Sequence, residues 1–162
     1  MKIRIIITGG TFDKHYDELN GSLTFKNTHL PEIIDHARLT VPVELEINQL
    51  IDSLDMGPSN RQAILDSCRN ADEDHIVIIH GTDTMAETAR VLGEAGLEKR
   101  IVLTGAMIPY AVTGTDAVFN LGCSIASVQL VEPGVYISMN GRVFPWNRVR
   151  KNREKGVFEK TG

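Results

Sequence analysis

Short runs of apolar, mostly β-branched residues recur along the chain, and three of them stop abruptly at small polar residues. Ile76–Ile79 is followed by His80-Gly81-Thr82-Asp83-Thr84-Met85, Ile3–Ile7 by Thr8-Gly9-Gly10-Thr11, and Ile101–Leu103 by Thr104-Gly105-Ala106-Met107. Runs of this length predict buried strands. In open parallel sheets, ligands bind beyond the carboxyl ends of the strands, beside the N-termini of helices. We therefore expect these three strand ends to form one shared polar site.

The residues between these runs repeat at helical spacing or alternate as in strands. Helical spacing is found over Pro31–Arg38, Ser59–Ala71, Thr84–Gly96 and Thr115–Leu130. Further strands are predicted over Val43–Ile47 and Gly134–Met139, and Asn140-Gly141 favours a type I′ turn into Arg142-Val143-Phe144. This alternation predicts an α/β fold with a mainly parallel sheet flanked by helices on both faces. We expect a flavodoxin- or Rossmann-like three-layer arrangement with a C-terminal hairpin.

Two of the predicted helices begin with the spacing of a capping box, Ser59 with Gln62 and Thr84 with Glu87. We therefore interpret Thr84 as a structural cap. In the helix over 115–130, the residues expected to face the sheet are Val118, Leu121, Ile125 and Val128.

Three segments lack a sustained helical or strand period. Phe12–Thr28 is polar and long for a connection, which is typical of a functional loop such as a lid, and Asn20-Gly21 is placed to form a hairpin turn inside it. Leu50–Pro58 is a second irregular loop. The tail after Asn147 is rich in Lys and Arg and poor in apolar residues. On composition alone, that tail predicts a solvated, frayed end.

Length and composition indicate a single domain over 1–162 with one substantial core. The formal net charge of −4 gives no electrostatic footprint for nucleic acid. Cys68 and Cys123 lie far apart within predicted helices, which favours packed, reduced thiols over a disulfide. The run Ile3–Ile7 is shorter than a signal-peptide core, and no segment reaches the roughly 20 apolar residues of a membrane helix. We predict a cytoplasmic protein with no membrane or nucleic-acid partner.

The chemistry available is that of threonine hydroxyls at strand ends with an adjacent aspartate. No G-x-x-x-x-G-K-[ST] or G-x-G-x-x-G loop is present, and the histidines lack metal-ligand spacing, so we predict no metal and no other cofactor. A threonine acts as nucleophile only when a neighbouring group removes its proton and amides stabilise the oxyanion. Without such neighbours, Thr11 and Thr82 are ordinary helix caps.

The segments Thr8–Thr11, His80–Met85 and Gly105–Met107 closely resemble the three signature segments of the bacterial-type L-asparaginase family, types I and II, which are amidohydrolases that use threonine. Asp52-Ser53-Leu54-Asp55-Met56 is similar to that family's substrate-carboxylate loop, and Asp116 with Phe119-Asn120-Leu121 to its next helix. The resemblance covers essentially the whole chain. It implies hydrolysis of the side-chain amide of L-asparagine to L-aspartate and ammonia through a threonine acyl-enzyme.

Carried over position by position, the resemblance implies a set of catalytic residues. Thr11 is the primary nucleophile, and Tyr16 in the predicted lid is the tyrosine that pairs with it. Thr82 and Asp83 match the family's second threonine and its aspartate. Lys151 aligns with the lysine that completes a Thr–Lys–Asp arrangement, which gives the basic tail a function.

The resemblance also implies the substrate contacts. Ser53 would bind the α-carboxylate of the substrate and Asp83 its α-ammonium, while the carbonyl of Ala106 would receive the side-chain amide. Gly10 is a further binding position, because a glycine-flanked loop brings backbone N–H groups close to a carboxylate. Asp83 accepts hydrogen bonds only, which suits an ammonium group. Lys151 can act as a base only where burial or nearby cations lower its pKa.

Family subunits usually carry a second, C-terminal domain, whereas this sequence ends shortly after Lys151. The resemblance therefore implies one asparaginase N-terminal-type domain over 1–162 without that second domain, either as a naturally short relative or as an excised domain. We expect a homo-oligomer, a dimer or a dimer of dimers, with the helix over 115–130 and the final hairpin as contact surfaces.

Two alternatives to asparagine hydrolysis stay open. One is an amidohydrolase that acts on another amide, and the other is a non-catalytic module that binds aspartate or asparagine. Tyr110 is the rival to Tyr16 as the catalytic tyrosine, although the spacing from Thr11 favours Tyr16.

Overall fold

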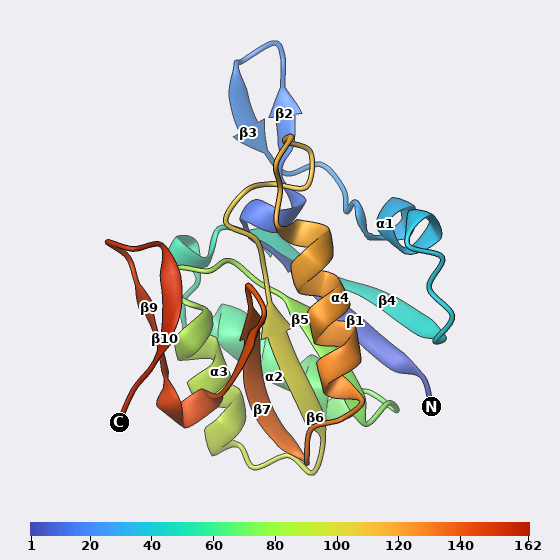
Figure 1. The fold of residues 1–162 in the computed structure, drawn as a ribbon, viewed down its shortest axis with the longest axis vertical. Coiled ribbons are helices and arrows are strands. Elements are labelled where there is room, and N and C mark those ends of the chain that lie inside the picture. Colours follow the sequence, from blue (N-terminus) through green and yellow to red (C-terminus); the bar gives the residue numbers. More distant parts are fainter.

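The computed structural model describes all of residues 1–162, and its strands form three β-sheets (Figure 1). The largest sheet has six strands in the order β4-β1-β5-β6-β7-β8. They are β1 (Ile3–Gly9), β4 (Val43–Ile51), β5 (His75–Ile79), β6 (Arg100–Thr104), β7 (Gly134–Met139) and β8 (Arg142–Pro145). All neighbouring strands pair in parallel except β7 and β8, which pair antiparallel. The predicted mainly parallel sheet is confirmed.

Helices cover both faces of this sheet and create two cores (Figure 1). They are α1 (Leu30–His36), α2 (Pro58–Asn70), α3 (Met85–Glu94) and α4 (Ala117–Val128). In β5, Ile76 and Ile78 belong to the core on the side of α2 and α3, whereas Val77 and Ile79 belong to the core on the side of α1 and α4. Side chains alternate between the faces of a strand, so a continuous apolar run fills both cores. The predicted α/β three-layer fold is confirmed.

Two hairpins end the chain. β7 and β8 form the predicted one, and its turn has positive φ at Asn140 (48°) and Gly141 (86°), as a type I′ turn requires. A second hairpin, β9 (Val149–Asn152) with β10 (Val157–Lys160), follows the 3₁₀ helix η3 (Trp146–Arg148). It occupies the segment whose composition predicts a frayed end, so that prediction was wrong. Its ordering follows from Phe158, which is buried in the core that contains α3.

A third hairpin lies in the segment predicted to be a lid. It consists of β2 (His15–Asp17) and β3 (Ser22–Thr24), and it follows the 3₁₀ helix η1 (Thr11–Asp13) at the end of β1. The hairpin projects from the body of the molecule (Figure 1). The predicted turn at Asn20-Gly21 is confirmed, since the N–H of Gly21 donates to the carbonyl of Asp17 at 2.8 Å.

Two details of the predicted helices were wrong. α2 begins at Pro58, and the N–H of Gly57 donates to the side chain of Asn60 at 2.9 Å, so Ser59 is not the cap. Proline fits the first turn because its missing N–H would have no partner there. In α4, Val118 is 43% exposed instead of facing the sheet.

The two cysteines are free thiols, as the sequence predicts. Cys68 is buried in α2, and burial raises the pKa of its thiol to about 12. Cys123 is partly buried in α4. No helix combines the length and the apolar character that crossing a membrane demands.

Candidate active site

Three strand ends of the main sheet meet, and glycines let them approach closely. A Cβ atom on Gly10, after β1, would lie 2.5 Å from the Cα of Gly81, after β5. A Cβ on Gly81 would lie 2.7 Å from the Cβ of Ser53, and a Cβ on Gly105, after β6, would lie 2.3 Å from the carbonyl oxygen of His80. Only glycine fits at these positions. The expected meeting of the three strand ends is confirmed. The loop between β4 and α2 that carries Ser53, called the Ser53 loop below, packs against them.

Two of the threonines at strand ends, Thr8 and Thr104, form hydrogen bonds within the sheet. The Thr8 hydroxyl donates to the carbonyl of Ile79 at 2.7 Å, and the Thr104 hydroxyl donates to that of Ser138 at 2.8 Å. Both threonines are fully buried. Because each hydroxyl proton is committed to a neighbouring strand, neither is free to act on a substrate.

Lys151 brings Thr82 and Asp83 together. Its Nζ lies 2.8 Å from Thr82 Oγ1 and 2.8 Å from Asp83 Oδ1, and its side chain is only 11% exposed. A carboxylate accepts only, so Asp83 holds the Nζ of Lys151 beside the Thr82 hydroxyl. Lys151 Nζ donates to both of these oxygen atoms. The structure therefore contains the side-chain cluster that the resemblance implies, while the catalytic roles stay a prediction.

Thr84 ties the Ser53 loop to the start of α3. Ser53 begins the 3₁₀ helix η2 (Ser53–Asp55) and is buried. Its hydroxyl oxygen accepts the N–H of Thr84 at 3.2 Å, and its carbonyl accepts the Thr84 hydroxyl at 2.8 Å. Thr84 is the N-cap residue of α3, as predicted, but its side chain makes no capping bond, so the predicted capping box with Glu87 does not form. Its hydroxyl holds a predicted substrate-binding residue instead.

Asp116 organises the loop that carries Ala106. Its carboxylate accepts the N–H groups of Met107 and Ile108, each at 3.0 Å, and the side-chain amide of Asn140 at 2.9 Å. Burial alone would raise the pKa of Asp116, but these donors outweigh it and lower that pKa. Because the peptide between Ala106 and Met107 is trans, the Ala106 carbonyl points away from Asp116. Asp116 thus orients a predicted substrate contact, a role that motif comparison alone does not assign.

Thr11 and Tyr16 are not part of one buried cluster. Thr11 begins η1 and is partly exposed. Tyr16 lies in β2 opposite Leu23 of β3 and is 59% exposed. The rival, Tyr110, packs against the ring of His29 with the ring centroids 5.1 Å apart. The pairing of a tyrosine with Thr11 stays a prediction.

His80 is fully buried between β5 and the start of α3. Its Nδ1 lies 2.7 Å from the carbonyl oxygen of Gly81, and its Nε2 lies 2.7 Å from Thr88 Oγ1. Burial lowers the pKa of His80 to about 4; the bond to Gly81 opposes this shift, and the charge of Arg61 adds to it. No group of three or more His, Cys, Asp or Glu side chains is arranged to hold a metal ion.

The amino-acid sequence is similar to those of known proteins. The family described as asparaginase, N-terminal, matches residues 2–158. L-asparaginase 1 of Escherichia coli (strain K12) is 31% identical over 166 residues, which cover 95% of this chain and 48% of that protein. A glutamyl-tRNA(Gln) amidotransferase polypeptide of Aeropyrum pernix is 34% identical over 132 residues, which cover 76% of this chain and 31% of that protein.

Solved structures of L-asparaginases have a similar fold. The thermostable L-asparaginase from Thermococcus kodakarensis superposes with a TM-score of 0.88 at 27% identity, over 99% of this chain and 51% of that one. The chain spans about half the length of the first curated relative and of this solved structure.

We expect the free energy of unfolding to fall as the pH drops from 6.5 to 4, in part because of His80. Above pH 6.5 the imidazole is neutral in both states. Between the two pKa values the unfolded chain binds a proton that the folded chain does not, which costs about 3 kcal/mol at about 1.4 kcal/mol per pKa unit.

Denaturant unfolding of wild type and His80→Asn across this pH range measures the effect. The variant should lose less stability over the range than wild type, by about that amount. An equal loss in the two proteins would show that His80 titrates normally in the folded state.

Proposed function

Because the chain belongs to the asparaginase family, we propose that it hydrolyses the side-chain amide of L-asparagine to L-aspartate and ammonia. The observation that carries the proposal is the position of Lys151 Nζ, 2.8 Å from both Thr82 Oγ1 and Asp83 Oδ1. An amine nitrogen within hydrogen-bond distance of a hydroxyl and a carboxylate is an arrangement for moving a proton onto and off that hydroxyl.

In the proposed first step, the Thr11 hydroxyl oxygen attacks the amide carbon of asparagine and gives up its proton. The C–N bond then breaks, and ammonia leaves with a proton. In the second step, water attacks the ester on Thr11, the C–O bond to Thr11 breaks, and aspartate leaves as the threonine regains its proton. Tyr16 pairs with Thr11, while Thr82 and Lys151 assist the proton transfers.

The substrate contacts of this proposal draw on three loops. Asp83 holds the α-ammonium group, and Ser53 holds the α-carboxylate beside Gly10, whose own N–H already donates to the carbonyl of Ile51 at 3.0 Å. The carbonyl of Ala106 receives the amide nitrogen. Support comes from the close packing of Gly10, Gly81 and Ser53, which brings these groups to one place. A polar pocket assembled from fixed groups orients the amide toward the nucleophile.

Substitution of the two threonines tests the proposal. In an assay of ammonia release from L-asparagine, Thr11→Ala and Thr82→Ala should each lower kcat by about 10³-fold or more, because each removes a hydroxyl that forms or relays a bond to the reacting carbon. Thr40→Ala is the matched control: Thr40 is exposed and lines the groove between α1 and α4, which contains no predicted active-site residue, so the variant should keep wild-type activity. If either site variant retains most of its activity, the roles have been assigned wrongly.

A second candidate function is hydrolysis of a different amide. The relative from Aeropyrum pernix, which is named as part of an amidotransferase, favours this candidate, since it has similar sequence and a different name. Ammonia released from L-glutamine or from an asparaginyl peptide, and none from L-asparagine, would select it. Binding of aspartate with no turnover of any amide would select a non-catalytic module.

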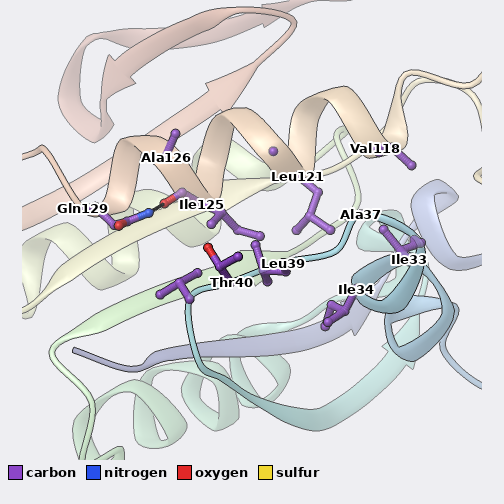
Figure 2. A pocket seen from close by; sticks show the side chains of 12 residues that line it. Ile33, Ile34, Ala37, Leu39, Thr40, Val118, Leu121, Ile125, Ala126 and Gln129 are labelled. Carbon is purple, nitrogen blue, oxygen red and sulfur yellow. Dashed lines mark hydrogen bonds between the residues drawn. The ribbon is translucent and has the colours of Figure 1, made fainter.

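We also propose that the protein is a homo-oligomer that contacts its copies through α4. Phe119 is 60% exposed, and Val118 beside it lines an apolar groove between α1 and α4 with a volume of about 280 Å³. Figure 2 shows Leu39 opposite Leu121 and Ile125 of α4 across this groove. None of the groove's lining residues belongs to the predicted active site. Contiguous exposed apolar side chains mark interaction surfaces, and closed symmetric dimers are the commonest soluble oligomers.

Light scattering at micromolar concentration tests this surface. A dimer has twice the 17.9 kDa mass of the chain, about 36 kDa. Phe119→Asp should shift the mass toward the monomer, because a charge would be buried in the contact. Leu19→Asp, at the tip of the β2–β3 hairpin, controls for loss of an exposed apolar side chain and should leave the mass unchanged. A monomer mass for wild type would refute the proposal.

A further inference from the structure

A chain of hydrogen bonds runs through the interior from Arg61 in α2 to the peptide that precedes Thr82. Arg61 Nε lies 3.1 Å from Thr88 Oγ1 in α3. Thr88 Oγ1 lies 2.7 Å from His80 Nε2, and His80 Nδ1 lies 2.7 Å from the carbonyl oxygen of Gly81. Thr88 and His80 are fully buried, and Arg61 is only 8% exposed. None of these contacts reaches a substrate group directly.

The chemistry of the groups determines the direction of every bond. The carbonyl of Gly81 can only accept, so Nδ1 of the neutral His80 ring carries the hydrogen and Nε2 is unprotonated. Nε2 therefore accepts the Thr88 hydroxyl proton, and Thr88 Oγ1 accepts from the Arg61 guanidinium, which can only donate. With its pKa at about 4, the ring stays neutral at physiological pH. By donating to Thr88 Oγ1, Arg61 orients the Thr88 hydroxyl toward His80 Nε2.

Arg61 is itself anchored to two elements of the site. Its Nη1 donates to the carbonyl of Met56, the residue after η2, at 3.0 Å. Its Nη2 lies 3.2 Å from Glu87 Oε2 in the first turn of α3, an ion pair without hydrogen-bond alignment. The chain of bonds therefore connects α2, the end of the Ser53 loop and α3 to a single peptide group.

We propose that Arg61, Thr88 and His80 form a relay that positions Thr82 by holding the Gly81–Thr82 peptide in one orientation. The carbonyl of Gly81 and the N–H of Thr82 belong to one planar group, so rotation of that group would move Thr82. Glycine adds no side-chain restraint of its own, and its backbone is the most permissive of any residue. The proposal rests on the proposed asparagine hydrolysis and makes the three side chains positioning residues.

Paired substitutions at Thr88 test the relay. Thr88→Val keeps the shape of the side chain and removes the hydroxyl, whereas Thr88→Ser retains it. In ammonia release from L-asparagine, with folding verified by circular dichroism, Thr88→Val should lower kcat about tenfold with KM within about twofold of wild type. Thr88→Ser should restore kcat to within about twofold. An unchanged kcat in Thr88→Val, or an equal loss in Thr88→Ser, would overturn the proposal.

Nuclear magnetic resonance gives a readout that needs no turnover. The imidazole ¹⁵N chemical shifts of wild type should show that His80 is protonated at Nδ1 and unprotonated at Nε2. The backbone amide resonance of Thr82 should move in Thr88→Val and stay in place in Thr88→Ser. Protonation at Nε2, or a Thr82 resonance unmoved by Thr88→Val, would refute the relay. If wild type releases no ammonia, the proposed function fails, and the Thr82 resonance alone decides on the relay.

A second variant covers the case in which Thr88→Val does not fold. Arg61→Met removes the donor that orients the Thr88 hydroxyl, so the Thr82 amide resonance should move as in Thr88→Val and kcat should again fall about tenfold. An unmoved Thr82 resonance together with wild-type kcat would contradict the proposal.

Discussion

The close backbone contact between strand ends is the constraint on which the site depends. Gly10 rests on Gly81, and Gly81 rests on Ser53, with spacings that leave no room for a Cβ atom. Gly105 meets the end of β5 in the same way. Loops that carried side chains here would be pushed apart, and their threonine, serine and carbonyl groups would no longer lie close together. The glycines are therefore what converts three buried strands into one polar site.

The second requirement is that the end of the chain returns to this site. Lys151 pairs across the β9–β10 hairpin with Phe158, and residues directly opposite in an antiparallel pair share one face. Because Phe158 is buried in the core, Lys151 on the same face points inward toward Thr82 and Asp83. A slip of one residue in this register would place Lys151 and Phe158 on opposite faces of the hairpin, so one of them would turn outward. Packing of one aromatic ring thus determines where the ammonium group of Lys151 lies.

Local sequence patterns predict the main strands and one turn correctly. The predictions that failed concern residues whose contacts lie far away in the sequence. Continuous β-branched runs locate β1, β5 and β6, and Asn140-Gly141 locates a turn that needs two positive φ angles. The capping spacing at Thr84 is also local, yet its hydroxyl is taken by a loop residue far along the chain. The β9–β10 hairpin depends on one aromatic, Phe158, within a charged segment. Most predicted site residues lie close together, as their motifs indicate. Thr88, which contacts His80, and Arg61, which contacts Thr88, lie on two separate helices, and no sequence spacing reveals this connection.

The central claim is that the hairpin delivers Lys151 as the group that moves a proton on Thr82. The direct measurement is kcat for ammonia release from L-asparagine by Lys151→Met, beside the matched variant Lys155→Met in the same hairpin. Lys155 is 71% exposed and only approaches Glu159 at 3.7 Å. The account predicts that Lys151→Met lowers kcat by about 10³-fold while Lys155→Met stays within about twofold of wild type. Wild-type kcat in Lys151→Met would contradict it.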